Sequence, residues 1–264
     1  MTEEADIRTV QVVRYVTPLR EGGSLPAIAE ADDGFLYVLK FRGAGQGIKS
    51  LIAELIGGEL ARRIGLKVPE IVFANLDEAF GRTEPDEEIQ DLLKASVGLN
   101  IALHYLSGSI TFDPIVTNIP PLLASKIVWL DCLLTNVDRT ARNTNMLIWK
   151  NELWLIDHGA SLYFHHAGLQ MGITQIKPFP QVKDHVLLEY ATQLEEVDKQ
   201  LKKVLTPKVI ADVLSLVPDE WLTIEESDLS IEDKRAVYSN FLNRRIQSSE
   251  IFINEAQMAR NELV

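Results

Sequence analysis

The feature that most constrains the fold of this chain is an eleven-residue polar segment, TNVDRTARNTN, at Thr135 to Asn145. An apolar run with helical character, Leu122 to Leu134, comes directly before it, and the short apolar run MLIW comes directly after it. Runs of this kind are typical of a buried helix and a buried strand. The polar segment is therefore predicted to be a loop whose two ends are both held by buried elements.

A hairpin is predicted behind this loop. After MLIW a turn at Asn151 leads into a second apolar run, ELWLI, which ends at Asp157 in the sequence Asp-His-Gly. Two short strands joined by a tight turn bring their outer ends to one edge. The hairpin can thus bring together three groups: Asp138, an amide at Asn143 or Asn145, and Asp157.

These residue types in this order suit phosphoryl transfer, which needs an acid near the attacking hydroxyl, oxygen ligands for magnesium and a cation on the ATP phosphates. Asp138 would orient or deprotonate the acceptor hydroxyl. An asparagine and Asp157 would hold Mg²⁺, and Lys40 in the predicted strand FLYVLKF would supply the cation. A strand lysine, then D-x-x-x-x-N, then Asp-x-Gly is the order found in protein kinases.

Four longer stretches make the resemblance more specific. KFRGAGQG, LIAELIGGELARRIGLKVPE, NVDRTARNTNMLIW and LWLIDHG resemble the HipA-like kinase family, and the similarity spans most of residues 20–165. It implies an ATP- and Mg²⁺-dependent phosphotransferase with a bilobal, protein-kinase-like α+β fold. Residues 1–106 would form a nucleotide-binding lobe of antiparallel sheet with one or two helices. Residues 107–264 would form a mainly helical lobe that carries the catalytic loop and the metal-binding aspartate.

The resemblance also implies which residues contact the nucleotide. Lys40 would lie on the phosphates, and a helix glutamate would pair with it. A glycine turn between the first two strands would let backbone N–H groups approach the ligand closely. The adenine would lie between the lobes near His104-Tyr105-Leu106. The full set of expected nucleotide-binding residues is Lys40, Glu54, Gly22, Gly23, His104, Leu106 and Ile156.

Two of these assignments have alternatives. Asn143 has the expected spacing from Asp138, whereas Asn145 has the expected apolar continuation, and Asn143 is preferred. For the partner of Lys40, the register of the motif selects Glu54, whereas a helical wheel puts Glu59 nearer the apolar face. Glu54 is kept as the expected partner.

Elsewhere the chain shows a change from strands to helices. The long segment 161–185 has little periodicity and is predicted to be an activation or substrate loop. Between the predicted strands 68–75 and 96–106 lies the acidic, helix-like segment 84–94. The other predicted strands are 9–18, 25–31 and 35–41, and the predicted helices are 47–64, 122–134, 186–204, 207–216 and 231–260.

Composition excludes several classes of function. The formal net charge of −12 disfavours direct binding to nucleic acid. The single cysteine, Cys132, lies in an apolar run and is expected to be buried, and the histidines lack zinc-site spacing. An N-terminus without a basic and apolar leader, and the lack of any long apolar stretch, favour the cytoplasm and no contact with a membrane.

The acceptor is not encoded in any motif. Serine or threonine in a protein is the first expectation, and a small-molecule hydroxyl is a minor alternative. A different reading is a non-catalytic module with a kinase-like fold that binds nucleotide or a partner. The presence of Lys40, Asp138 and Asp157 together favours an active enzyme. The sequence predicts neither an oligomeric state nor a regulator.

Overall fold

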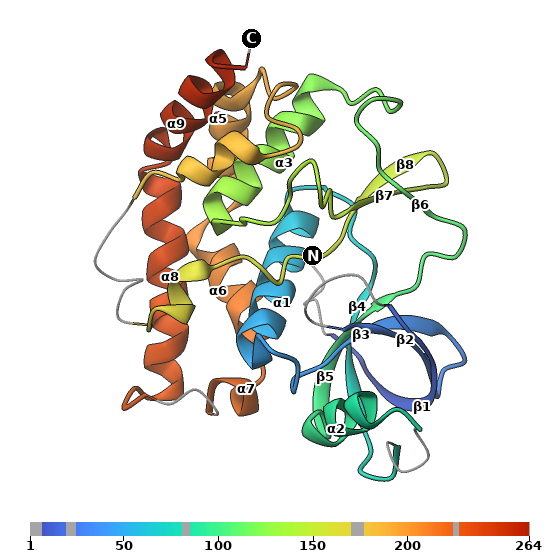
Figure 1. Ribbon diagram of the computed structural model, residues 1–264. Helices are drawn as coiled ribbons and strands as arrows, with labels where there is room; N and C mark the ends of the chain where they lie inside the picture. Colours follow the sequence, from blue (N-terminus) through green and yellow to red (C-terminus); the bar gives the residue numbers. More distant parts are fainter. Residues whose placement is uncertain (1–6, 20–24, 81–84, 170–176, 224–226, 264) are drawn as a thin grey trace.

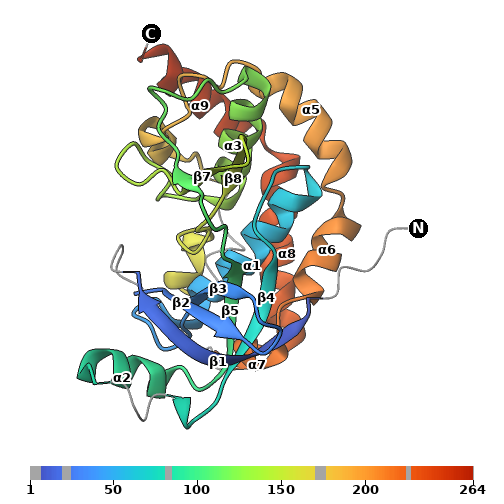
Figure 2. The same ribbon diagram turned by 90° about the vertical axis from the view of Figure 1, so that its right-hand side faces the viewer.

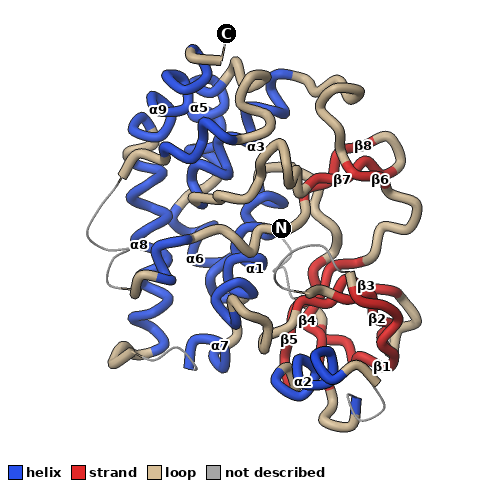
Figure 3. The backbone as a smooth tube through the Cα atoms, viewed as in Figure 1, coloured by secondary structure: helices blue, strands red, loops and turns tan. Residues whose placement is uncertain are grey.

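The computed structural model describes residues 7–19, 25–80, 85–169, 177–223 and 227–263. Most strands gather at one end of the molecule and most helices at the other, as Figures 1 and 3 show. Both parts lie where the change from strands to helices in the sequence predicts them. The division at residue 106 itself stays a prediction, because helix α1 from the first part packs against the second.

Five strands of the N-terminal part form a closed barrel in the order β1-β2-β3-β5-β4. The first three make the predicted antiparallel meander, whereas β1 pairs with β4 in parallel and closes the barrel, which the sequence did not predict. Closure removes the exposed edges that an open sheet would leave. The strands are β1 (Thr9–Pro18), β2 (Ala27–Ala31), β3 (Leu36–Lys40), β4 (Ile71–Leu76) and β5 (Gly98–His104).

The alternation of side chains along β3 sets the direction of Lys40. Tyr37 and Leu39 are buried inside the barrel, at 2% and 0% exposure. Because neighbouring side chains of a strand point to opposite faces, Lys40 points away from the barrel interior. It lies in the cleft between the two parts of the molecule.

Helix α1 (Gly47–Arg63) joins the two parts. Its residues from Leu51 to Ala61 are all buried, and all of them except Glu54 and Glu59 are apolar or glycine, which fits a helix that other elements surround. These apolar side chains belong to the core cluster of the helical part, not to the barrel interior. Gly57 and Gly58 in the middle of α1 lower its intrinsic stability but allow neighbours to come close.

The C-terminal part packs its helices around one core that contains Trp129, Trp221 and Tyr238. Cys132 is buried in this core as predicted, and burial raises the pKa of its thiol. No helix in the described part of the chain is long and apolar enough to cross a bilayer. The helices are α3 (Pro121–Leu134), α5 (Leu194–Val204), α6 (Pro207–Ser215), α7 (Asp219–Thr223), α8 (Ile231–Gln247) and α9 (Glu250–Asn261), whereas α2 (Glu87–Ala95) lies at the outer end of the barrel (Figure 2).

The predicted hairpin is present and gains a third strand. β6 (Ile110–Thr111), β7 (Met146–Trp149) and β8 (Glu152–Leu155) form a sheet in that order. Lys150 and Asn151 make the turn with φ of 51° and 61°. Two positive φ angles are the signature of a type I′ turn, whose twist matches the hairpin.

Two of the predicted helices are wrong in part. The helix predicted over 186–204 begins only at Leu194. Before it, residues 185–191 bury Leu187 and Leu188 through successive turns with hydrogen bonds between residues three apart. The helix predicted over 231–260 is interrupted at Ser248 and Ser249, between α8 and α9. Apolar side chains are buried throughout both segments, so the apolar pattern alone hides the breaks.

The close contact at Gly57 generates a prediction. A Cβ atom at this position would lie 2.7 Å from the Cβ of His158, so α1 or the loop after β8 would have to move. Gly57→Ala should therefore lower the free energy of unfolding by about 1–3 kcal/mol, measured by urea denaturation. Gly45→Ala is the matched control, because a Cβ there meets nothing within 4 Å. Equal stability of the two variants would contradict the contact.

Candidate active site

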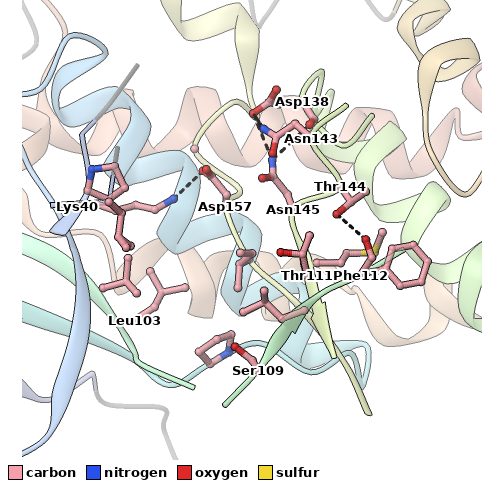
Figure 4. A pocket seen from close by; sticks show the side chains of 18 of the residues that line it. Lys40, Leu103, Ser109, Thr111, Phe112, Asp138, Asn143, Thr144, Asn145 and Asp157 are labelled. Atoms are coloured by element: carbon pink, nitrogen blue, oxygen red, sulfur yellow. Dashed lines mark hydrogen bonds and ion pairs between the residues drawn. The ribbon is translucent and has the colours of Figure 1, made fainter. Parts of the chain in front are cut away.

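A cleft of about 1750 Å³ lies between the barrel and the helical part. Its walls include Lys40 from β3, His104 from β5, Asp138 and Asn143 from the loop after α3, and Asp157 from the loop after β8. Figure 4 shows Asp157 between Lys40 on one side and the group of Asp138, Asn143 and Asn145 on the other. The fold thus brings the predicted charged residues into one space.

Lys40 is held by two carboxylates. Its Nζ lies 2.6 Å from Oε2 of Glu54 and 2.7 Å from Oδ1 of Asp157. Burial alone would lower the pKa of Lys40, but the charges of Asp157 and Glu54 outweigh it and raise this pKa. Burial likewise opposes ionisation of Glu54, yet Lys40 and the backbone N–H of His158 lower its pKa to about 2. Lys40 and Glu54 are therefore both charged at neutral pH.

The two candidate glutamates of α1 have different surroundings. Glu54 is fully buried and contacts Lys40. Glu59 lies 3.7 Å from Arg62, one turn of helix away, and burial raises the pKa of its carboxyl group. The structure therefore places Glu54, the residue that the motif register selects, beside the lysine.

Both candidate asparagines donate hydrogen bonds to Asp138. Nδ2 of Asn143 lies 2.8 Å from Oδ2 of Asp138, and Nδ2 of Asn145 lies 3.2 Å from the same oxygen. Burial raises the pKa of Asp138, the bond from Asn145 opposes this, and the charge of Asp157 adds to it. The two amides orient the Asp138 carboxylate. Because both asparagines bond to the same oxygen, these bonds do not distinguish the metal ligand from its alternative.

Two of the polar residues that line the cleft have left-handed backbone conformations. Asn145 has φ of 48° and Asp157 has φ of 57°. Non-glycine residues rarely adopt such angles, although Asn and Asp tolerate them better than others. The backbone is held by the bond from the N–H of Ile156 to the carbonyl of Asn145, at 3.0 Å. This geometry turns both polar side chains toward the cleft.

The donor set fits magnesium. Asn143 and Asn145 use their amide nitrogens on Asp138, so their amide oxygens are available as ligands. Asp157 contacts Lys40 through Oδ1 and its side chain is 41% exposed. Mg²⁺ takes one or two protein carboxylates together with phosphate and water oxygens. The described residues contain no group of three or more His, Cys, Asp and Glu side chains that could hold a metal by itself.

A buried ion pair beneath the loop was not predicted from the sequence. Asp131 is fully buried in α3, and its carboxylate accepts bonds from Nε of Arg139 at 2.6 Å and from Nδ2 of Asn136 at 2.9 Å. Arg139 also donates to the carbonyl of Asn145. It therefore ties the helix before the loop to the strand after it. The signal in the sequence was the lone acid within IVWLDCLL, since a buried carboxylate needs a partner.

The end of the predicted activation or substrate loop closes over the same pair. Nε2 of His185 lies 3.0 Å from Oδ2 of Asp131, while its Nδ1 accepts from the N–H of Leu187. His185 also forms a bridge with Thr140, and the N–H of Val186 donates to the carbonyl of Arg139 at 3.1 Å. The segment 177–186 is therefore anchored to the loop that carries Asp138.

The other predicted nucleotide contacts are placed as follows. His104, Leu106 and Ile156 line the cleft. The N–H of His104 donates to the carbonyl of Glu70, just before β4, and the N–H of Tyr105 donates to the carbonyl of Leu36 in β3. Neither group is therefore free to bond to an adenine. The N–H of Leu106 has no hydrogen bond to any described residue. Gly22 and Gly23 lie outside the described residues.

Comparison with known proteins identifies a family and a similar fold. The profile of the HipA-like kinase family matches residues 12–253. A proinflammatory kinase of Helicobacter pylori, CtkA, has a similar structure, with a TM-score of 0.56, 12% identity, and coverage of 97% of this chain and 99% of that one. The Golgi casein kinase with Mn/ADP bound gives a TM-score of 0.47 at 11% identity, over 92% of this chain and 72% of that one. No curated protein matches the sequence. The likeness to CtkA confirms the predicted kinase-like α+β fold.

The buried ion pair generates a stability prediction. Asp131→Asn leaves the guanidinium of Arg139 buried beside a neutral amide, which should lower the free energy of unfolding by about 3–5 kcal/mol at neutral pH. Despite burial, Arg139 and His185 lower the pKa of Asp131, so its contribution is present above its unfolded pKa of about 3.9 and is lost as the pH falls below that. The difference from wild type should thus shrink in acid.

Urea denaturation at several pH values measures this difference. Asp212→Asn is the matched control, because its ion pair with Lys208 is exposed and should contribute less than about 1 kcal/mol. Equal loss in both variants would show that the buried pair has no special role in stability.

Proposed function

Because this chain belongs to the HipA-like kinase family, we propose that it transfers the γ-phosphate of ATP to a hydroxyl group, in the first place to serine or threonine of a protein. The observation that carries the proposal is the convergence of Lys40, Asp157 and Asp138 in one cleft. The family and the fold support a phosphotransferase in general. Serine or threonine as the acceptor, and the cytoplasm as the location of this protein, rest on the sequence expectations.

In this proposal the charged residues have separate roles. Lys40, kept charged and oriented by Glu54, lies on the ATP phosphates. Asp138 accepts the proton of the acceptor hydroxyl. At the same time the hydroxyl oxygen bonds to the γ-phosphorus, and the bond between the γ-phosphorus and the bridging oxygen of ADP breaks. Positioning and charge supply most of the rate in such reactions. The hydrogen bonds from Asn143 and Asn145 hold Asp138 ready for that role.

Asp157 and Asn143 would hold Mg²⁺, with Asn145 as the alternative to Asn143. The ion would neutralise charge on the phosphates. Asp157 has a second role without the metal, because it pairs with Lys40 and so keeps the ammonium group from being buried beside a single carboxylate. His104, Leu106 and Ile156 would surround the base, and the N–H of Leu106, which bonds to no described residue, would donate a hydrogen bond to its edge.

Nucleotide binding is tested by thermal denaturation with and without ATP and Mg²⁺. A ligand that binds only the folded state at 100 times its dissociation constant stabilises it by about 2.7 kcal/mol, which raises the Tm by several degrees. The rise should require Mg²⁺ and be lost in Asp157→Ala. Asp91→Ala, at a residue of α2 that is 80% exposed, is the control and should retain the rise. A wild-type protein with no rise at millimolar ATP would contradict the proposed nucleotide site.

Transfer is tested separately with Asp138→Asn and labelled ATP. This variant should keep the Mg²⁺-dependent rise in Tm but transfer phosphate about 100-fold to 10,000-fold more slowly, because the base is lost and the metal ligands remain. Unchanged transfer would remove Asp138 from the mechanism. A rise in Tm without transfer to any acceptor by the wild type would favour the non-catalytic binding module.

A further inference from the structure

Two segments run side by side at the mouth of the cleft. β6 pairs with β7, and beyond it the N–H of Phe112 donates to the carbonyl of Met146 at 3.0 Å. The hydroxyl of Thr144 donates back to the carbonyl of Phe112 at 3.3 Å, as Figure 4 shows. From there one segment continues as 113–116 and the other leads back to 141–144. We call residues 113–116 and 141–144 the acceptor ledge.

The first half of the ledge exposes large apolar side chains. Ile115 is 90% exposed and Val116 is 79% exposed, and Ile115 also lines the cleft. The backbone beneath them is well held: Oδ1 of Asp113 accepts from the N–H of Ile115 at 2.8 Å, and the N–H of Thr117 donates to the carbonyl of Asp113 at 3.0 Å. These two neighbouring apolar side chains offer surface that a partner can cover, and burial of apolar surface is favourable.

The second half carries an exposed cation. Arg142 is exposed and lines the cleft, yet it makes no ion pair with any residue that the structure describes. Lys40, the other Lys or Arg among the described lining residues, contacts two carboxylates. In a chain with a net charge of −12, carboxylates are plentiful, so an arginine that pairs with none of the described ones is a candidate to bind an external anion.

The exposure of the ledge, rather than the size of the cleft, indicates what kind of acceptor it takes. Lys40, Asp157 and Leu106 mark the nucleotide side. Figure 4 shows Thr144 and Phe112, where the ledge begins, on the same side of Asp157 as Asp138 and away from Lys40. The side chains of Ile115 and Val116 are exposed to water rather than enclosing a small ligand. An extended polypeptide fits this shape better than a metabolite.

We propose that the acceptor ledge binds an extended polypeptide that carries an acidic side chain and an apolar side chain close to its acceptor hydroxyl. Arg142 binds the acidic side chain, and Ile115 and Val116 pack against the apolar one. Arg142 is four residues after Asp138 in the same loop, so the acidic residue lies within a few positions of the serine or threonine. This inference rests on the proposed function and specifies its substrate.

Pools of serine peptides test the ledge. Each pool has Glu, Gln or Lys fixed at one position near the serine and mixed residues elsewhere, and transfer from labelled ATP is measured. At one or more positions the wild type should select Glu over Gln by about threefold, as expected for a partly exposed ion pair. Arg142→Glu should select Lys over Glu at the same positions. Lys199→Glu on α5 is the matched control, with the same charge change at an exposed lysine outside the cleft, and should behave as the wild type.

The rise in Tm with ATP and Mg²⁺ separates the possible anions. An unchanged rise in Arg142→Glu together with altered peptide selection supports the ledge, whereas a lost rise shows that Arg142 holds the nucleotide phosphates and overturns it. In matching pools with Leu or Ser fixed at one position, Ile115→Ser should reduce the preference for Leu without altering the selection of Glu. Equal use of Glu, Gln and Lys by the wild type, or no transfer to any pool, overturns the ledge as a polypeptide site. No rise in the wild type overturns the proposed function as well.

Discussion

The pair of Asp131 and Arg139 is the constraint on which the geometry of the cleft depends. Two charges without access to water are stable only when each has close partners, because the cost of removing ions from water is several kcal/mol for each one. Asp131 meets this requirement with Arg139, Asn136 and His185. Arg139 in turn reaches the carbonyl of Asn145. The position of the polar loop is therefore fixed by its bonds to Asp131 on α3, without any contribution from a ligand.

A second fixed point joins the two parts of the molecule. Glu54 belongs to a helix whose apolar side chains pack with the C-terminal core, yet its carboxylate holds Lys40 on a strand of the barrel. The backbone N–H of His158 donates to the same carboxylate oxygen, at 2.8 Å. One buried carboxylate thus sets the distance between the lysine and the loop that carries Asp157.

Local patterns in the sequence predicted the elements that local forces decide. The loop from Thr135 to Asn145, the hairpin and the strand lysine follow from apolar runs and turn residues. Contacts between distant segments could not be predicted in this way: the parallel pairing of β1 with β4, and the reach of His185 to Asp131 over 54 positions. Asn143 and Asn145 show the same limit, because spacing and apolar continuation favour different residues and the structure brings both to Asp138.

The contact of Gly57 with His158 has a mechanical consequence. With hydrogen in place of a side chain, the middle of α1 lies directly against the residue that follows Asp157. A rotation or sliding of α1 would push on His158 and carry Asp157 with it. The helix that supplies Glu54 and the loop that supplies Asp157 are therefore in direct steric contact, so the two carboxylates of Lys40 come from segments that constrain each other's position.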